Sequence, residues 1–175
     1  MDAIRPEDPT DPHRTAVGTV LWLLAAGAVL VGGVLHALIW NRKYRDLPSV
    51  VPGRWVVQVG FPVNVGASVI VAAALAAVAF GALAAVRRFV IPVALLLEVA
   101  SLLALIESRR GSFFQWTERE WDADAKEVLV VEVLAVLALG AAAFVPAFMA
   151  RRRGEPDARR VEPKAPIEQR MPGSN

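Results

Sequence analysis

The chain of 175 residues contains no cysteine. Disulfides, thiolate metal sites and cysteine nucleophiles are therefore excluded. It also has neither a glycine-rich phosphate loop nor an HExxH motif, and only one of its two histidines lies inside an apolar run. Since no catalytic set is complete, we expect a protein that is not an enzyme and that holds no cofactor and no metal.

Charged residues are scarce in four long stretches of the chain. The sequence is 55% hydrophobic, with a mean hydropathy of +0.46, and about 20 apolar residues suffice to cross the hydrocarbon core as a helix. Barrel strands would instead be about 10 residues long and would alternate in polarity. The runs therefore predict an all-α, four-helix transmembrane bundle with spans at about residues 17–40, 61–86, 89–106 and 128–150.

The transmembrane domain is expected over residues 15–150. The flanking segments, 1–14 and 151–175, are rich in proline and charge. Such segments bury too little apolar surface to fold alone, so we expect two disordered tails, the second of them basic.

Prolines and arginines suggest where the middle spans begin and end. Proline is best tolerated in the first turn of a helix. We therefore start the second span near Phe61, just before Pro62, and expect the segment before it to lie at the interface or to dip back into the protein. Pro92 suits the first turn of the third span. Arg87 and Arg88 leave almost no loop, which predicts a tight hairpin.

The placement of lysine and arginine predicts the orientation. Four spans put both termini on one side, with eleven basic residues there and in the second loop, against eight in the first and third loops. Basic residues next to spans are retained on the cytoplasmic side. We expect cytoplasmic termini in a bacterial plasma membrane, and the small net charge of +2 gives no support for nucleic-acid binding.

Aromatic side chains gather in the first and third loops. The members of this group are Trp40, Tyr44, Trp55, Trp116 and Trp121. One explanation is an interfacial anchor, because such rings settle at the headgroup level. The alternative is that the two loops pack into an external cap that docks a partner.

Acidic residues in and after the third loop do not predict a cation site. Asp122, Asp124 and Glu127 lack the spacing of a calcium loop. Thr117 and Glu120 have the spacing of a capping box, so we expect a solvated helix start there.

Four polar residues lie inside the predicted spans: His36, Asn64, Glu98 and Glu132. An acid at mid-membrane costs at least about 2.5 kcal/mol, so such groups normally face the bundle interior or water. At 1.5 Å per residue, His36 and Glu132 lie about 6 Å, and Glu98 about 12 Å, from the outer ends of their spans. They form either helix-to-helix hydrogen bonds or a common polar site that opens outward.

Small residues predict where helices approach one another closely. Glycines precede His36 by one turn, and the second span carries small residues at every fourth position. The predicted packing face consists of Gly32, Gly33, Ala73, Ala77, Gly81 and Ala85.

Two functions agree with these features. The first is an accessory or scaffolding subunit that packs against a larger membrane complex or against itself within the bilayer. The second is a small proton-coupled or solute transporter or channel that uses Glu98, His36 and Glu132.

Two segments carry a resemblance. They are His36-Ala-Leu-Ile-Trp-Asn-Arg-Lys-Tyr-Arg-Asp-Leu-Pro48, followed by a span with an early Asn64, and Gly111-Ser-Phe-Phe-Gln-Trp-Thr-Glu-Arg-Glu-Trp121, which leads to Glu132. Over residues 15–150 the chain resembles small four-helix membrane proteins of actinobacteria that have no assigned function. The resemblance implies a fold and a plasma-membrane location, and it carries over no functional residue.

Overall fold

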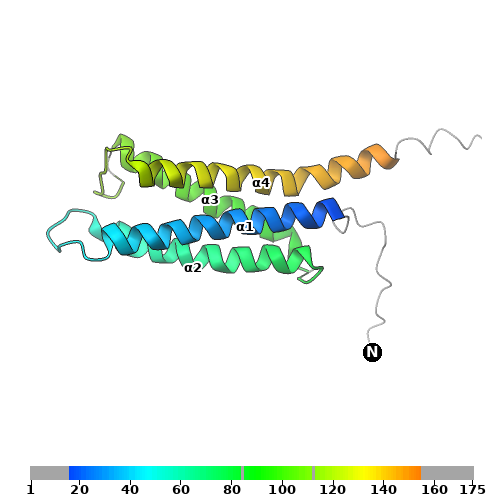
Figure 1. The fold of residues 1–175 in the computed structure, drawn as a ribbon, viewed down its shortest axis with the longest axis horizontal. Coiled ribbons are helices and arrows are strands. Elements are labelled where there is room, and N and C mark those ends of the chain that lie inside the picture. The colour runs from blue at the N-terminus through cyan, green and yellow to red at the C-terminus, as the bar shows by residue number, and fades with distance from the viewer. Residues whose placement is uncertain (1–15, 84, 112, 155–175) are drawn as a thin grey trace, which may run out of the picture.

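The protein is a bundle of long helices (Figure 1). The computed structural model describes residues 16–83, 85–111 and 113–154. The predicted tail 1–14 and residues 155–175 of the predicted tail 151–175 lie outside the described residues, whereas residues 151–154 belong to the last helix and not to a tail. The helices are α1 (Ala16–Ile39), which continues into a π-helical turn, η2 (Trp40–Tyr44), then α2 (Arg54–Ala79), α3 (Arg87–Arg110) and α4 (Ala123–Gly154). In this part of the chain, four helices are long and apolar enough to cross a membrane, which confirms the predicted all-α membrane fold.

Successive helices run in opposite directions, and α1 makes its most extensive contacts with α2 and α4. The first residue of α1 and the last residue of α4 therefore lie at the same end of the bundle (Figure 1). The opposite end carries residues 40–53, residue 111 and residues 113–122, which together with Arg54 and Trp55 at the start of α2 we call the cap. We call the end of the bundle that holds Ala16 the inner end.

The second helix begins earlier than predicted. It starts at Arg54, directly after Gly53 in a left-handed conformation (φ 69°), so Pro62 lies inside the helix and not at its start. Proline removes only one backbone hydrogen bond. Because apolar surroundings offer no water to the backbone, the remaining residues gain by staying helical. The segment before Phe61 is therefore helix and does not dip back into the protein.

The connection between α2 and α3 also differs from the prediction. Helix α2 ends at Ala79, and Gly81 (φ 84°) and Leu83 (φ 59°) turn the chain. Arg87 and Arg88 are consequently the first residues of α3 and not the loop itself.

The α2 part of the predicted packing face does not lie on the buried face of the helix. Ala73 and Ala85 are exposed, Ala77 is only half-buried, and Gly81 lies beyond the helix. The spacing of four residues drifts around a helix of 3.6 residues per turn, so these residues leave the packed face. The buried residues of α2 are Val57, Ser68, Val71, Ala72, Leu75 and Val78.

The bundle interior is arranged in three layers along its axis. An inner apolar cluster comprises Trp22, Ala25, Ala26, Val29, Val71, Ala72, Leu75, Val78, Val90, Ile91, Ala94, Ala135, Leu139 and Ala142. An outer apolar cluster below the cap comprises Ile39, Tyr44, Val57 and Val128. Between these two clusters the buried residues include His36 on α1, Ser68 on α2 and Glu132 on α4, and Glu98 is buried on α3. The fold therefore holds a polar layer between two apolar ones.

Close helix contact at this level depends on Gly33. A Cβ added there would lie 2.7 Å from Cβ of Ser68 on α2, whereas one added at Gly27, in the same helix, would meet nothing within 4 Å. Gly33 thus sets how closely α1 approaches α2.

We predict that Gly33→Ala destabilises the bundle by about 1–3 kcal/mol, because the extra methyl forces the two helices apart. Gly27→Ala is the matched control and should be neutral or stabilising by up to about 1 kcal/mol, since alanine favours helix. Reversible unfolding in mixed detergent micelles measures both. Equal effects of the two substitutions would contradict this account of the α1–α2 contact.

Candidate functional site

Every helix contributes to the polar layer. It comprises His36 of α1, Asn64 and Ser68 of α2, Glu98 and Ser101 of α3, and Glu132 of α4. The charged or titratable members are deeply buried, with exposed fractions of 7% for His36, 4% for Glu98 and 1% for Glu132. All four polar residues singled out in the sequence thus lie at one level of the bundle.

His36, Ser101 and Glu132 form a connected triad. Nε2 of His36 lies 3.5 Å from Oε1 of Glu132 and 3.4 Å from Oγ of Ser101. Ser101 also donates a hydrogen bond to the same carboxyl oxygen. A serine therefore bridges the imidazole and the acid, which come from three different helices.

The triad has two consistent proton arrangements. Nδ1 of His36 lies 2.9 Å from the carbonyl of Gly32, which only accepts, so Nδ1 carries a proton. With Nε2 also protonated, Nε2 donates toward Ser101, whose hydroxyl donates to an ionised Glu132. With Nε2 unprotonated, a protonated Glu132 donates to Ser101, which donates to Nε2. Both arrangements have the same net charge, so a proton can shift along the triad without adding charge to the membrane interior.

Glu98 lies one helical turn further from the cap than Ser101. A Cβ at Gly32 would lie 4.0 Å from its Oε2, so Glu98 packs against the glycine whose carbonyl accepts from His36. On α2, Oγ of Ser68 donates to Oδ1 of Asn64 at 3.2 Å. Glu98 and the triad therefore meet the same glycine segment of α1.

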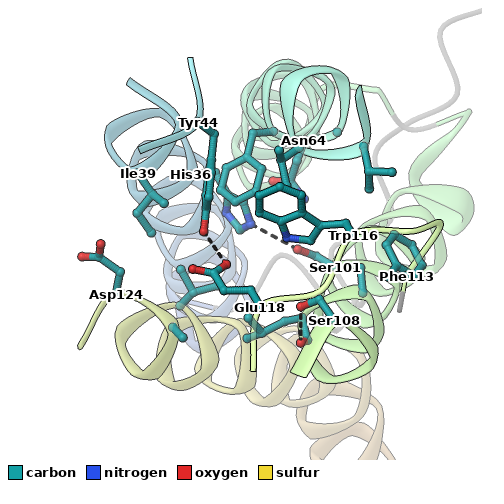
Figure 2. A pocket seen from close by; sticks show the side chains of 18 of the residues that line it. His36, Ile39, Tyr44, Asn64, Ser101, Ser108, Phe113, Trp116, Glu118 and Asp124 are labelled. Atoms are coloured by element: carbon teal, nitrogen blue, oxygen red, sulfur yellow. Dashed lines mark hydrogen bonds between the residues drawn. The ribbon is translucent and has the colours of Figure 1, made fainter. Parts of the chain in front are cut away.

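A cavity leads from the cap to this layer (Figure 2). Its volume is about 170 Å³, well above the ~10–15 Å³ that one water needs. His36, Asn64 and Ser101 line its deep end, and Phe61, Tyr44 and Trp116 are among its walls. Glu132 does not line the cavity and lies behind His36 and Ser101. The triad thus connects a solute-sized space to a buried acid.

The π-helical turn explains how Tyr44 enters this cavity. The amide of Arg45 donates to the carbonyl of Trp40, five residues earlier, at 2.8 Å. In an uninterrupted α-helix, Lys43 would share the face of His36, seven residues before it. The π-helical turn contains one extra residue, so Tyr44 takes the position on the face of His36 and is buried. Lys43 points to the surface instead.

The third loop closes over the cavity through a buried arginine. Nη1 of Arg109 lies 2.9 Å from the carboxylate of Glu118 and donates to its backbone carbonyl at 2.7 Å. The hydroxyl of Tyr44 donates to the same carboxylate at 2.6 Å. Nε of Arg109 is buried without a hydrogen-bond partner in the described structure. Arg109, Glu118 and Tyr44 thus tie the third loop to the end of α1.

The first and third loops pack together, as one of the two sequence hypotheses predicts. A Cβ at Gly53 would lie 2.6 Å from the carbonyl carbon of Gln115, so only glycine fits between the loops. The rings of Trp55 and Phe114 are 5.9 Å apart. The cap is therefore a packed unit and not two separate loops.

Ion pairs join the end of α1 to the start of α4. Lys43 contacts Asp122, and its Nζ lies 2.7 Å from Asp124. Arg42 donates to Asp124 at 3.1 Å. Of the three acids singled out in the sequence, Asp122 and Asp124 therefore have basic partners. Among the described residues, no group of His, Cys, Asp and Glu side chains suits a metal ion.

The predicted capping box is wrong. Helix α4 begins at Ala123, after Thr117 and Glu120, and the amide of Ala125 donates to the Asp122 side chain at 2.9 Å. Asp122 is thus the N-cap, since its carboxylate serves both the helix amide and Lys43.

The five aromatic residues of the loops have different surroundings. Trp55 and Trp121 are exposed and suit the headgroup level. Tyr44 and Trp116 line the cavity, with ring centroids 5.6 Å apart, and Trp40 packs against the outer apolar cluster. An interfacial anchor therefore accounts for only two of them.

Comparison with known proteins adds no assignment. No protein-family model matches the chain, and no curated protein or solved structure is significantly similar to it.

We predict that Asp122→Ala destabilises the cap by about 1 kcal/mol more than Asp122→Asn, because asparagine keeps a capping oxygen and loses only the ion pair. The side-chain hydrogen bond from Lys43, and then the amide of Ala125, lower the pKa of Asp122. Its contribution is therefore complete at neutral pH and is lost only as pH falls below about 4. Tryptophan fluorescence during unfolding measures both effects. Equal losses for the two variants would exclude the capping role.

Proposed function

We propose that this membrane protein is a small proton-coupled carrier that takes a solute into the cavity from the cap side. The observation that carries the proposal is the cavity itself, whose deep end is formed by His36 and Ser101, which connect to the buried Glu132. Ionisable groups inside membranes mark binding sites and proton relays. A solute at His36 would be one hydrogen bond away from a group that exchanges a proton.

The packing of the inner half supports a carrier and not an open channel. From Trp22 to Val29 on α1, and from Ala135 to Ala142 on α4, the buried residues between the polar layer and the inner end are apolar. Carriers keep one side closed while the site opens to the other. The inner apolar cluster would then act as the closed side.

We further propose that the cap faces outward from a bacterial plasma membrane, with both termini cytoplasmic. The support is the distribution of basic residues, eleven against eight, with Arg151–Arg153 next to the last span. Access of an impermeant thiol reagent to a Ser49→Cys variant in intact cells measures this orientation, because the natural chain has no cysteine.

The carrier function predicts accumulation of a solute in proteoliposomes. Liposomes holding the protein are incubated with a mixed metabolite extract under an imposed pH gradient, and mass spectrometry identifies what enters. We expect gradient-dependent accumulation of one or more small solutes. Glu132→Gln and Glu98→Gln should abolish it, because an amide keeps the shape of the carboxyl group but carries no exchangeable acid proton.

Glu127→Gln is the matched control, since Glu127 is exposed on α4 outside the polar layer. It should leave accumulation unchanged. If no solute enters beyond the level of empty liposomes, or if the two buried-acid variants accumulate as much as the wild type, the carrier function is wrong.

A second candidate is an accessory subunit of a larger membrane complex. Three aromatic side chains of the cap are exposed, Trp55 by 57%, Phe114 by 63% and Trp121 by 41%. Aromatic residues are frequent at binding hot spots. This patch would supply the docking surface.

Purification in mild detergent from the native membrane, followed by mass spectrometry, tests the accessory function. We expect a stoichiometric partner that is lost from a Trp55→Ser, Phe114→Ser double variant. Phe80→Ser is the control, since Phe80 is 76% exposed near the inner end. A protein that purifies alone, or a partner retained by the double variant, would exclude this function.

A further inference from the structure

The cavity has aromatic walls. Tyr44 packs against Phe61 at 5.0 Å and against Trp116 at 5.6 Å between ring centroids, and Phe61 packs against His36 at 5.1 Å. Cations bind over aromatic faces within about 6 Å of the ring centroid. In the described part of the cap, the guanidinium of Arg45 lies over the ring of Trp40 and that of Arg109 over the ring of Trp121. None of the three cavity rings has such a cation-π contact. Since all three line the cavity, part of each ring faces the space that a ligand would fill.

The charged groups around the cavity do not favour an anion. Glu118, Asp122 and Asp124 line it together with two basic residues, Arg109 and His36. The Arg109 guanidinium is bound to Glu118, and the two aspartates are bound to Lys43 and Arg42 from outside the cavity. Each basic side chain that lines the cavity therefore already has an acidic partner, Glu118 for Arg109 and Glu132 for His36, so neither is left to bind an anion.

The polar layer beneath the cavity has more acids than bases. It holds two carboxyl groups, Glu98 and Glu132, and one imidazole, His36, while its members on α2, Asn64 and Ser68, do not titrate. With both carboxyls ionised and the imidazole protonated, the layer carries one uncompensated negative charge. A buried charge of this kind requires a counter-charge nearby. Either a bound proton or a cation in the cavity can supply it.

We propose that the cavity binds a small organic ammonium ion, held against Tyr44, Phe61 and Trp116, and that its binding displaces a proton from Glu98 or Glu132. The inference rests on the proposed carrier function and names its substrate class. Because cation and proton satisfy the same negative charge, occupancy by one excludes the other. The carrier would thus exchange the ammonium ion for a proton.

Choline and 3,3-dimethylbutan-1-ol test this directly. They have nearly the same shape, but only choline is charged. On the purified full chain in nanodiscs, calorimetry should show choline binding about tenfold or more tighter than the neutral alcohol. In weakly buffered solution a pH dye should report proton release on addition of choline, and none with Glu98→Gln, Glu132→Gln combined.

Two variants locate the site. Trp116→Leu should weaken choline binding about tenfold, because the ring is lost, whereas Trp55→Leu, an exposed residue of the same cap, should not. The comparison of choline with the neutral alcohol uses the wild-type protein, so it does not depend on whether either variant folds. Equal binding of choline and the alcohol, tighter binding of the zwitterion glycine betaine, or binding without proton release would overturn the inference.

These outcomes separate the inference from the carrier function. Solute accumulation that depends on Glu132 without choline binding would reject the ammonium site and leave the carrier. Choline binding with proton release but no accumulation would leave the site and reject the carrier.

Discussion

The structure depends on the need to satisfy polar groups where there is no water. Two acids and a histidine lie in the middle of an apolar bundle, and each would be costly if it faced lipid. They are accommodated because four helices bring polar atoms to one level, where Ser101 joins His36 to Glu132. Gly33 makes this possible, since any side chain there would crowd Ser68. The close approach of α1 to its neighbours follows from this layer.

The cap also depends on the need to satisfy buried polar groups. Arg109 is buried at the end of α3, and its guanidinium is satisfied by Glu118 on the loop that follows. Tyr44 joins the same carboxylate only because the π-helical turn rotates it inward. The ion pairs of Lys43 and Arg42 then fix the start of α4. Loops that look independent in the sequence are thus joined by a chain of charged groups.

Hydrophobicity was enough to predict the number of helices, because a span of about 20 apolar residues has few alternatives in a membrane. The buried polar residues were equally visible, since a charge such as Glu132 stands out in an apolar run. Ser101 did not stand out, because a serine in a transmembrane helix has no distinctive signal until its partners are known. The same holds for Arg109, which counts as a loop charge in the sequence. The start of α2 and the phase of Tyr44 depend on contacts between loops, which no local pattern contains.

The position of the polar layer also determines how membrane voltage would act on the proposed carrier. The cavity reaches the layer from the cap, and the inner apolar cluster separates it from the other end. A charge that travels from the cap to His36 therefore crosses only part of the transmembrane field. A potential of 100 mV biases a full crossing by about 2.3 kcal/mol per charge. In the proposed carrier, the arrival of a proton or cation at this layer would be biased by only a fraction of that, and the remainder would act on the motion that opens the inner half.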